Sequence, residues 1–257
     1  APDGESPGKS LQLNGGHVRV EDFDTVELLH GSDYTMACWL KPDPAALSGG
    51  SFIFGQGNQG IHNGVRVHDS NGSLPALHSA HWGSDRSAGT ELVADTWVHA
   101  IWTYDAEGGL ANIYLNVVND LKDFQQNAPN GDGILIVGSR NNGEVNNAFE
   151  GLLDDVRIWN QVLTRSEISA LSVDSDDDGF PDAYEQQVAN GLDVLSREGD
   201  ADSDGLADLV EFEVHGSDPL NEDSDGDTLK DGDEIAGVAP RPATSPTSVD
   251  TDGDGLS

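Results

Sequence analysis

Aspartate recurs at a regular spacing in the last third of the chain. The pattern Asp-x-Asp-x-Asp begins at Asp174, Asp200, Asp223 and Asp250, at intervals of 26, 23 and 27 residues. Carboxylates at this spacing converge on one point when the loop curls, and carboxylate oxygens are the hard ligands that calcium prefers. The repeat therefore predicts an array of loops that bind several calcium ions.

Each complete loop resembles an EF-hand loop, with candidate ligands at positions 1, 3, 5, 7, 9 and 12. Aspartates hold positions 1, 3, 5 and 9, position 7 offers its backbone carbonyl, and a glutamate at position 12 closes the shell. The predicted ligands are Asp174, Asp176, Asp178, Phe180, Asp182 and Glu185, then Asp200, Asp202, Asp204, Leu206, Asp208 and Glu211, then Asp223, Asp225, Asp227, Leu229, Asp231 and Glu234. A fourth loop offers only Asp250, Asp252 and Asp254.

Position 6 differs between the loops. Gly179 and Gly205 allow the sharp turn that this position requires, whereas Thr228 predicts a strained turn or a lower affinity in the third loop.

The alternative to an array of calcium loops is a solvated acidic tail, the usual meaning of a charge run. Such a tail does not keep a register that also places glycine and a closing glutamate. Without metal the segment should repel itself, so we expect calcium binding and folding to be coupled.

Charge and composition divide the 257 residues into two parts. The formal net charge is −35, and the segment from Asp174 to Ser257 contributes 25 acidic and three basic residues. Such a balance excludes nucleic acid as a partner and argues against anionic membranes. All five tryptophans precede that segment. We predict a flexible segment over 1–9, a β domain over 10–172 and the repeats over 173–257, as a piece of a longer secreted protein.

Short apolar runs separated by Gly, Asn and Asp predict that the β domain is a two-sheet sandwich or jelly roll. The expected strands are 10–20, 34–40, 51–54, 64–68, 97–104, 111–117, 134–137 and 151–159. Short helical segments are expected at 166–171, 183–190 and 207–215, and an irregular spacer at 240–246. No apolar run reaches the length of about 18 residues that a membrane span needs.

Several side chains in the β domain are candidates for core or ligand roles. Trp39, Trp97, Trp102 and Trp159 are expected in the core, as is Cys38, which has no partner for an intramolecular disulfide. Trp82 is the best candidate for an exposed platform that stacks on a ligand, and an ordinary loop residue is the alternative. A strand would place His78 and His81, three residues apart, on opposite faces, which disfavours zinc.

Catalytic patterns are weak, so we do not expect an enzyme. The nearest approach to a glycosidase strand motif spans Glu21 to Glu27, where Glu21 and Asp24 fall on opposite faces.

Asp154 shares a strand face with Val156 and Ile158, which are expected to point inward. A buried carboxylate needs a partner, either a hydrogen-bond donor or a cation.

Two family resemblances follow from these residues. Leu11–Val18, Tyr34–Pro42, Trp97–Asp105 and Phe149–Asn160 resemble, in this order, a laminin G-like, concanavalin A-like jelly roll. In that family an aspartate of the last strand often holds a structural calcium, which implies Asp154. Asp218-Pro-Leu-Asn221 before the third loop resembles bacterial thrombospondin type 3 repeats. That resemblance implies a calcium-stiffened rod with little hydrophobic core and adds Asp218 and Asn221 as ligands.

Together these features predict a secreted or bacterial cell-surface protein with structural calcium. Its sandwich would bind a glycan or an extracellular protein, displayed on the calcium-stiffened stalk. The alternative is a subunit of a calcium-dependent filament or matrix, in which Asp3 or Glu5 of a neighbour completes the fourth loop. A glycan hydrolase is a third hypothesis.

Overall fold

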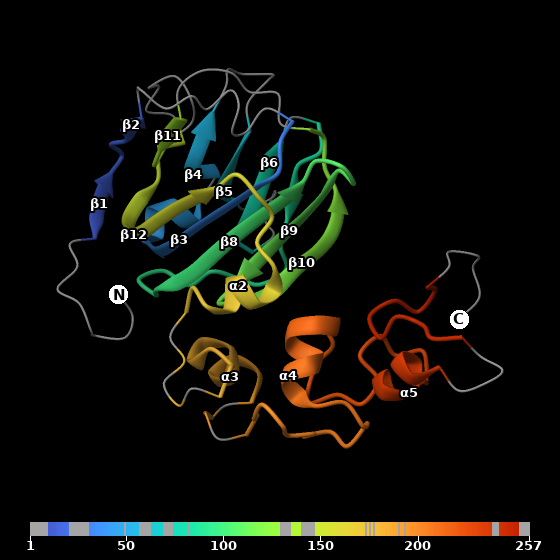
Figure 1. Ribbon diagram of the computed structural model, residues 1–257. Helices are drawn as coiled ribbons and strands as arrows, with labels where there is room; N and C mark the ends of the chain where they lie inside the picture. The colour runs from blue at the N-terminus through green and yellow to red at the C-terminus, as the bar shows by residue number, and fades with distance from the viewer. Residues whose placement is uncertain are drawn as a thin grey trace. The chain divides into compact units, whose positions relative to one another are not determined.

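Two compact units make up the chain, residues 1–163 and 164–257 (Figure 1). They are called the sandwich and the acidic unit below. The computed structural model describes residues 10–20, 31–48, 50–56, 63–68, 74–81, 83–128, 135–139, 147–172, 174, 176, 178–189, 191–192, 194–237 and 242–251. Within these ranges no helix has both the length and the apolar composition to cross a membrane.

Two antiparallel sheets form the sandwich, as predicted (Figure 1). Among the described residues the first sheet has the order β1 (Leu11–Asn14), β12 (Glu150–Trp159), β3 (Tyr34–Pro42), β8 (Val98–Asp105), β9 (Leu110–Leu115) and β10 (Val118–Gln125). The second has the order β2 (Val18–Val20), β11 (Leu135–Val137), β4 (Gly50–Gln56), β5 (Asn63–His68), β6 (Ala76–His81) and β7 (Arg86–Ser87). A short 3-10 helix, η1, spans Pro44–Leu47.

The predicted strand 10–20 is divided between the two sheets. It turns at Gly15, which has φ +73°, so that β1 pairs with β12 while β2 pairs with β11. The sequence pattern also missed β6, β7 and β10. Apart from Leu77 the residues of β6 are small or polar, yet all six are buried, and β10 lies at a sheet edge with Phe124 as its buried residue.

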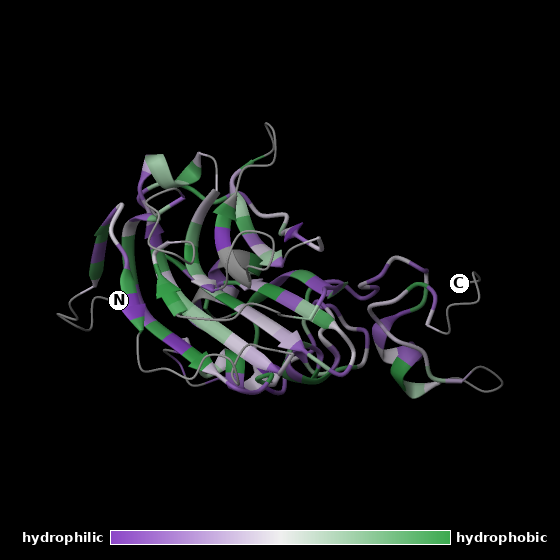
Figure 2. Cartoon of the chain, turned by 90° about the horizontal axis from the view of Figure 1, so that it is seen from above, coloured by the Kyte–Doolittle hydropathy of each residue, from purple (hydrophilic) through white to green (hydrophobic). Residues whose placement is uncertain are grey.

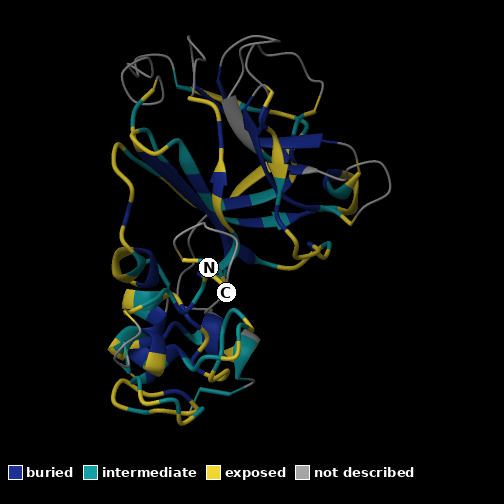
Figure 3. Cartoon of the chain, turned by 90° about the vertical axis from the view of Figure 1, so that its right-hand side faces the viewer, coloured by how far each residue is buried: buried dark blue, intermediate teal, exposed yellow. Residues whose placement is uncertain are grey.

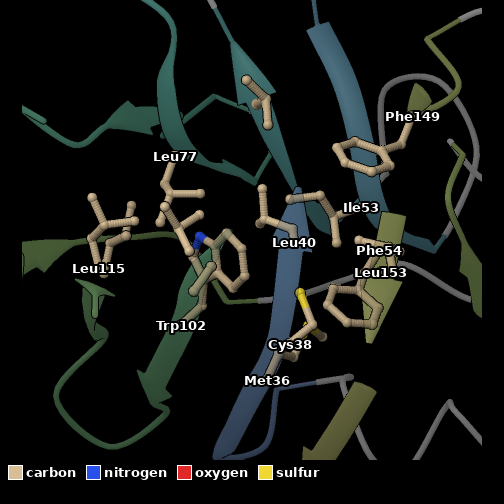
Figure 4. Close-up of a cluster of buried hydrophobic side chains, with 14 of the residues drawn as sticks. Met36, Cys38, Leu40, Ile53, Phe54, Leu77, Trp102, Leu115, Phe149 and Leu153 are labelled. Carbon is tan, nitrogen blue, oxygen red and sulfur yellow. The ribbon is translucent and has the colours of Figure 1, made fainter. Parts of the chain in front are cut away.

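The core lies between the sheets and follows the alternation of each strand. Hydrophilic and hydrophobic residues alternate along several strands in Figure 2, and buried positions follow the strands in Figure 3. Figure 4 shows side chains from both sheets meeting in one cluster, among them Cys38 and Leu40 from β3, Ile53 from β4 and Trp102 from β8.

Of the four tryptophans expected in the core, Trp102 alone is fully buried, at 1% exposure. Trp39, Trp97 and Trp159 are half-buried, which corrects that expectation. Because Cys38 and Leu40 point inward, Trp39 between them must point to the opposite face of the sheet. Trp159 follows Ile158, which packs against the core, and faces away for the same reason.

Gly151 occupies a backbone position that only glycine fits. Its φ is +143°, and a Cβ there would lie 2.3 Å from the Lys41 carbonyl oxygen and 3.0 Å from the Asp43 nitrogen. Gly151→Ala should therefore destabilise the sandwich by roughly 1–3 kcal/mol, the usual effect of overpacking. Denaturant unfolding followed by tryptophan fluorescence measures it, with Gly16→Ala as control because nothing lies within 4 Å of that position. Equal midpoints for the two variants would contradict this account.

Candidate metal centre

Short helices carry the ends of the acidic loops. The acidic unit contains α2 (Arg165–Ser169), α3 (Asp182–Val188), α4 (Asp208–Val210), the π-helix η2 (Glu211–His215) and α5 (Asp231–Ala236). The segments expected near 183–190 and 207–215 are thus helical, and α5 was not expected. α3, α4 and α5 each begin at loop position 9. One turn later, position 12 therefore lies on the same helix face.

The three complete loops share one hydrogen-bond pattern. At position 5 an aspartate accepts from the position-7 amide, at 2.9 Å from Phe180 to Asp178 and at 2.7 Å from Leu206 to Asp204. The third loop repeats this contact at 2.8 Å. In the first and third loops position 1 also accepts from the position-6 amide, at 3.0 Å from Gly179 to Asp174 and at 2.9 Å from Thr228 to Asp223. These bonds curl each loop around its own aspartates.

As a result the aspartates at positions 1, 3 and 5 come together as predicted. In each loop one carboxylate oxygen from each of the three lies within 4.8 Å of the others. The three groups are Asp174, Asp176 and Asp178; Asp200, Asp202 and Asp204; and Asp223, Asp225 and Asp227. Two oxygens that share a calcium at 2.3–2.6 Å can be up to about 5 Å apart, so each group fits one ion.

The position-12 glutamates are, together with Asp231, the most deeply buried charges among the described residues of the unit. Glu185, Glu211 and Glu234 are each 0% exposed. Both carboxylate oxygens of Glu185 and Oε2 of Glu211 have no hydrogen-bond partner. The same holds for one oxygen each of Asp202 and Asp225. A buried carboxylate without a partner costs several kcal/mol, so the unit needs a cation or protons here.

Burial is also the main cause of the titration shifts in the loops. It raises the pKa of Glu185 to about 8, and the neighbouring carboxylates led by Asp178 raise it further. The pKa of Glu211 is likewise raised to about 8 by burial and then by Asp202 and Asp204. These groups repel one another as long as nothing positive lies between them.

Two of the predicted ligands at position 9, Asp208 and Asp231, accept hydrogen bonds from residues near the start of their loops. Asp208 accepts from the Ala201 amide at 2.7 Å and from the Ser196 amide at 3.1 Å. Asp231 accepts from the Ser224 amide at 2.9 Å and from its hydroxyl at 2.6 Å. These two carboxylates tie the starts of α4 and α5 to the residues at the beginning of their loops. Sequence spacing alone gave no sign of this role.

Asp218 and Asn221 form the turn that leads into the third loop. Asp218 accepts from the Leu220 amide at 3.1 Å, and the Asn221 side chain donates to the Asp223 carbonyl at 2.8 Å. Among the described residues neither joins a cluster of potential ligands. Of the fourth loop, Asp250 is described, whereas Asp252 and Asp254 lie outside the described residues.

Thr228 adopts the strained turn that the sequence predicted, with φ +85°. A β-branched residue in that region costs about 1–3 kcal/mol. Thr228→Gly should therefore tighten calcium binding in the third loop, by about fivefold for a gain of 1 kcal/mol. The reciprocal change, Gly205→Thr, should weaken the second loop, because Gly205 has φ +102° and open space around it. Calorimetric titration tests both, and affinities unchanged in both variants would contradict the prediction.

The acidic unit has an aromatic core, which corrects the expectation of little hydrophobic packing. The ring centroids of Tyr184 and Phe212 are 4.4 Å apart, and those of Phe180 and Phe212 are 5.2 Å apart. The Arg165 guanidinium lies over the Phe212 ring at 4.2 Å. Because Phe180 is position 7 of the first loop and Phe212 follows position 12 of the second, this core joins the two loops.

In the sandwich, the candidate platform Trp82 lies outside the described residues. The neighbouring histidines point to opposite faces of β6, as expected. His81 Nε2 lies 2.8 Å from the Tyr34 hydroxyl in the interior. His78 Nδ1 lies 2.7 Å from the Ser87 hydroxyl, and its Nε2 lies 3.1 Å from Arg66.

Ser87 and His78, with Asp85 3.7 Å from the imidazole, have the composition of a Ser-His-Asp triad. Arginine can only donate, so Nε2 of His78 accepts from Arg66 and Nδ1 carries the proton toward Ser87. In that tautomer the imidazole cannot take a proton from the serine. The arrangement is therefore a structural hydrogen-bond network and not an activated nucleophile.

Comparison with known proteins agrees with this fold. The family model described as the concanavalin A-like lectin/glucanases superfamily matches residues 13–169, more than half of the chain. The chain belongs to this superfamily. A relative, adhesion G-protein coupled receptor V1 of Danio rerio, is 32% identical over 150 residues. That match covers 54% of this chain and 2% of the receptor, so the chain spans a small part of this relative.

Solved structures of similar fold include two that concern carbohydrate. Domain 4 of AbnA, an extracellular arabinanase from Geobacillus stearothermophilus in complex with arabinotriose, is 22% identical with a TM-score of 0.48. That match covers 64% of this chain and 77% of the other. A putative carbohydrate binding protein from Bacteroides ovatus is 20% identical with a TM-score of 0.49, covering 67% and 48% respectively.

The last strand of this concanavalin A-like sandwich has a bulge that the sequence did not reveal. The register of β12 on β3 shifts between Asp154 and Arg157, and Asp155 has φ +46°. Val156 is consequently 38% exposed, so the prediction that it points inward was wrong. Asp154 accepts from the Asp155 amide at 2.9 Å. Its role as a calcium ligand remains a prediction.

His99 gives the superfamily sandwich a specific pH dependence. It stacks on Trp39 with ring centroids 4.7 Å apart, and burial lowers its pKa to about 4. The unfolded chain binds this proton near the ordinary pKa of 6.5, so stability falls as pH drops from 6.5 to 4, by about 3 kcal/mol. Denaturant unfolding between these pH values should show a flatter profile for His99→Gln than for wild type. Parallel profiles would contradict the prediction.

Proposed function

We propose that the acidic unit folds around calcium ions and that the chain is an extracellular calcium-dependent binding and structural protein. One observation carries the calcium proposal. In each complete loop a fully buried glutamate at position 12 closes a loop whose three clustered aspartates hold positions 1, 3 and 5. Solvated acidic tails do not bury carboxylates, and a buried cluster without counter-charge is unfavourable.

The donor set fits calcium better than other common cations. All side-chain donors are carboxylate oxygens, which suit calcium and magnesium and not the softer metals. Magnesium demands octahedral geometry and retains several waters, whereas calcium accepts six to eight oxygens in a flexible shell. The loops would hold calcium through Asp174, Asp176, Asp178 and Glu185 and through the corresponding residues of the next two loops. The ion would supply the counter-charge that fixes the loop and helix together.

The repeats are proposed to be of thrombospondin type 3 character. Asp218 and Asn221 form a turn that places Asp223 at the start of its loop, and the three loops share one hydrogen-bond pattern. Their calcium would be structural, stiffening the segment that follows the sandwich. A filament built through the fourth loop would use Asp252, Asp254, Asp3 or Glu5, which all lie outside the described residues.

For the sandwich we propose binding of a glycan or an extracellular protein, without catalysis. Support comes from the superfamily, whose description includes lectins, and from the adhesion receptor relative. The superfamily also includes glucanases, but the acidic run from Glu21 to Glu27 lies outside the described residues, and its spacing disfavours a nucleophile and acid pair. Release of sugar from a panel of polysaccharides would contradict the non-catalytic proposal.

Calcium titration of the chelated protein tests the proposal. Far-UV circular dichroism should show helix forming as calcium is added, while magnesium at the same concentration gives a much smaller change. Light scattering on the same sample should remain that of a monomer, and growth to large assemblies would favour the filament. A spectrum that ignores calcium would overturn the proposed function. A glycan array with calcium present then tests the sandwich.

A further inference from the structure

The second and third loops meet at a cluster that belongs to neither loop alone. Asp204 and Glu211 of the second loop and Asp231 of the third each place a carboxylate oxygen within 4.8 Å of the other two. Glu211 and Asp231 are each 0% exposed. Glu211, whose Oε2 has no hydrogen-bond partner, thus belongs to a group of carboxylates contributed by two repeats.

Backbone contacts hold the two repeats in register at this point. The Gly232 amide, in the first turn of α5, donates to Oδ2 of Asp204 at 2.7 Å, while Oδ1 of Asp204 accepts from Leu206. A Cβ on Gly232 would lie 2.4 Å from the Asp204 carbonyl oxygen. The approach is therefore so close that only glycine allows it, and it brings Asp231 next to the second loop.

We propose that the cation of the second loop takes Asp231 of the third loop as an additional ligand, so that this site is built from two repeats. This inference rests on the proposed calcium binding of the loops. The ligand set is Asp200, Asp202, Asp204 and Glu211 with Asp231. The oxygens of Asp231 already accept from Ser224, and each keeps a second lone pair for a cation.

The junction between the first and second loops is different. There no carboxylate faces the first loop at Gly179, because the Leu209 side chain and the Arg197 guanidinium lie 3.0 and 3.3 Å from the Cβ position of that glycine. Asp208, which is equivalent to Asp231 in loop position, accepts from Ser196 and Ala201. Among the described residues no cluster of potential ligands combines the first two loops. Within the described part of the chain, a carboxylate from the following loop is thus found at the second site and not at the first.

Glycine amide signals in a nitrogen-15 NMR calcium titration of the full chain distinguish the loops. Gly179 reports the first loop, Gly205 the second and Gly226 the third. In Asp231→Asn the calcium midpoint of Gly205 should rise about tenfold or more, while that of Gly179 changes less than twofold. Asp233→Asn, which removes an exposed charge from the same helix turn, should leave both midpoints within twofold.

Glu234→Gln separates a direct ligand from general loss of the third loop. It removes the closing carboxylate of that loop and retains Asp231, so Gly226 should need much more calcium while Gly205 stays within about threefold. Should Asp231→Asn fail to fold, Gly232→Ala keeps every carboxylate and disturbs only the junction, and it should also raise the Gly205 midpoint. The inference would be overturned if the calcium midpoint of Gly205 in Asp231→Asn and in Gly232→Ala were the same as in Asp233→Asn. Indifference of all three signals to calcium in wild type would overturn the proposed function itself.

Discussion

Glu211→Gln should weaken calcium binding in the second loop about 10- to 100-fold, because it removes one charge and one of two oxygen donors from the closing ligand. Without calcium the same substitution should have the opposite effect on the stability of the acidic unit. Glu211 is fully buried with Oε2 unpaired, so neutralising it relieves a desolvation cost and should make the chelated acidic unit more ordered. A merely structural glutamate would lose stability in both conditions.

Circular dichroism and calorimetry with and without chelator measure both effects. Glu213→Gln is the matched control, since Glu213 lies on the same π-helix, carries the same charge and is only partly buried. It should change the calcium affinity of the second loop less than twofold. If Glu211→Gln binds calcium as tightly as Glu213→Gln, position 12 is not a ligand.

Phe212→Ala should remove most of the packing of the acidic unit. Phe212 is 1% exposed and contacts Phe180, Tyr184 and Arg165, and truncation of a buried phenylalanine costs about 3–5 kcal/mol. Since folding and calcium binding are linked, this cost should appear as a calcium midpoint raised at least tenfold.

Val214→Ala is the control for that variant, because Val214 is 70% exposed two residues further along the same helix. Its calcium midpoint should match wild type. The tryptophans all lie in the sandwich, so their fluorescence should report an unchanged unfolding midpoint for both variants. Equal calcium responses in Phe212→Ala and Val214→Ala would show that the aromatic core does not support the loops.

Local chemistry in the loops could be predicted because each role depends on nearby residues. The aspartates at positions 1, 3 and 5 converge through hydrogen bonds within the loop, such as that from Leu206 to Asp204. The turn at Thr228 is strained because this β-branched residue itself has a positive φ. The sandwich was predictable for a similar reason, since alternation along β3 determines which side chains point inward.

Features that depend on contacts between distant residues could not be predicted. The bulge at Asp155 depends on the register of β12 against β3, and it turned Val156 outward against the simple alternation. The strand β6 is buried by its neighbours although half of its residues are polar. The contact of Gly232 with Asp204 joins residues 28 apart in sequence, and no spacing rule reveals it. One local signal was overlooked, the capping box of Thr164 and Glu167 that begins the acidic unit.

Counting bound calcium tests the central claim most directly. The chelated chain would be dialysed to equilibrium against buffered calcium, and metal analysis would give the number of ions per chain. The account predicts at least three ions for wild type and one fewer in Glu185→Gln at calcium concentrations that just saturate wild type. A chain that retains no calcium above the dialysis buffer would contradict it.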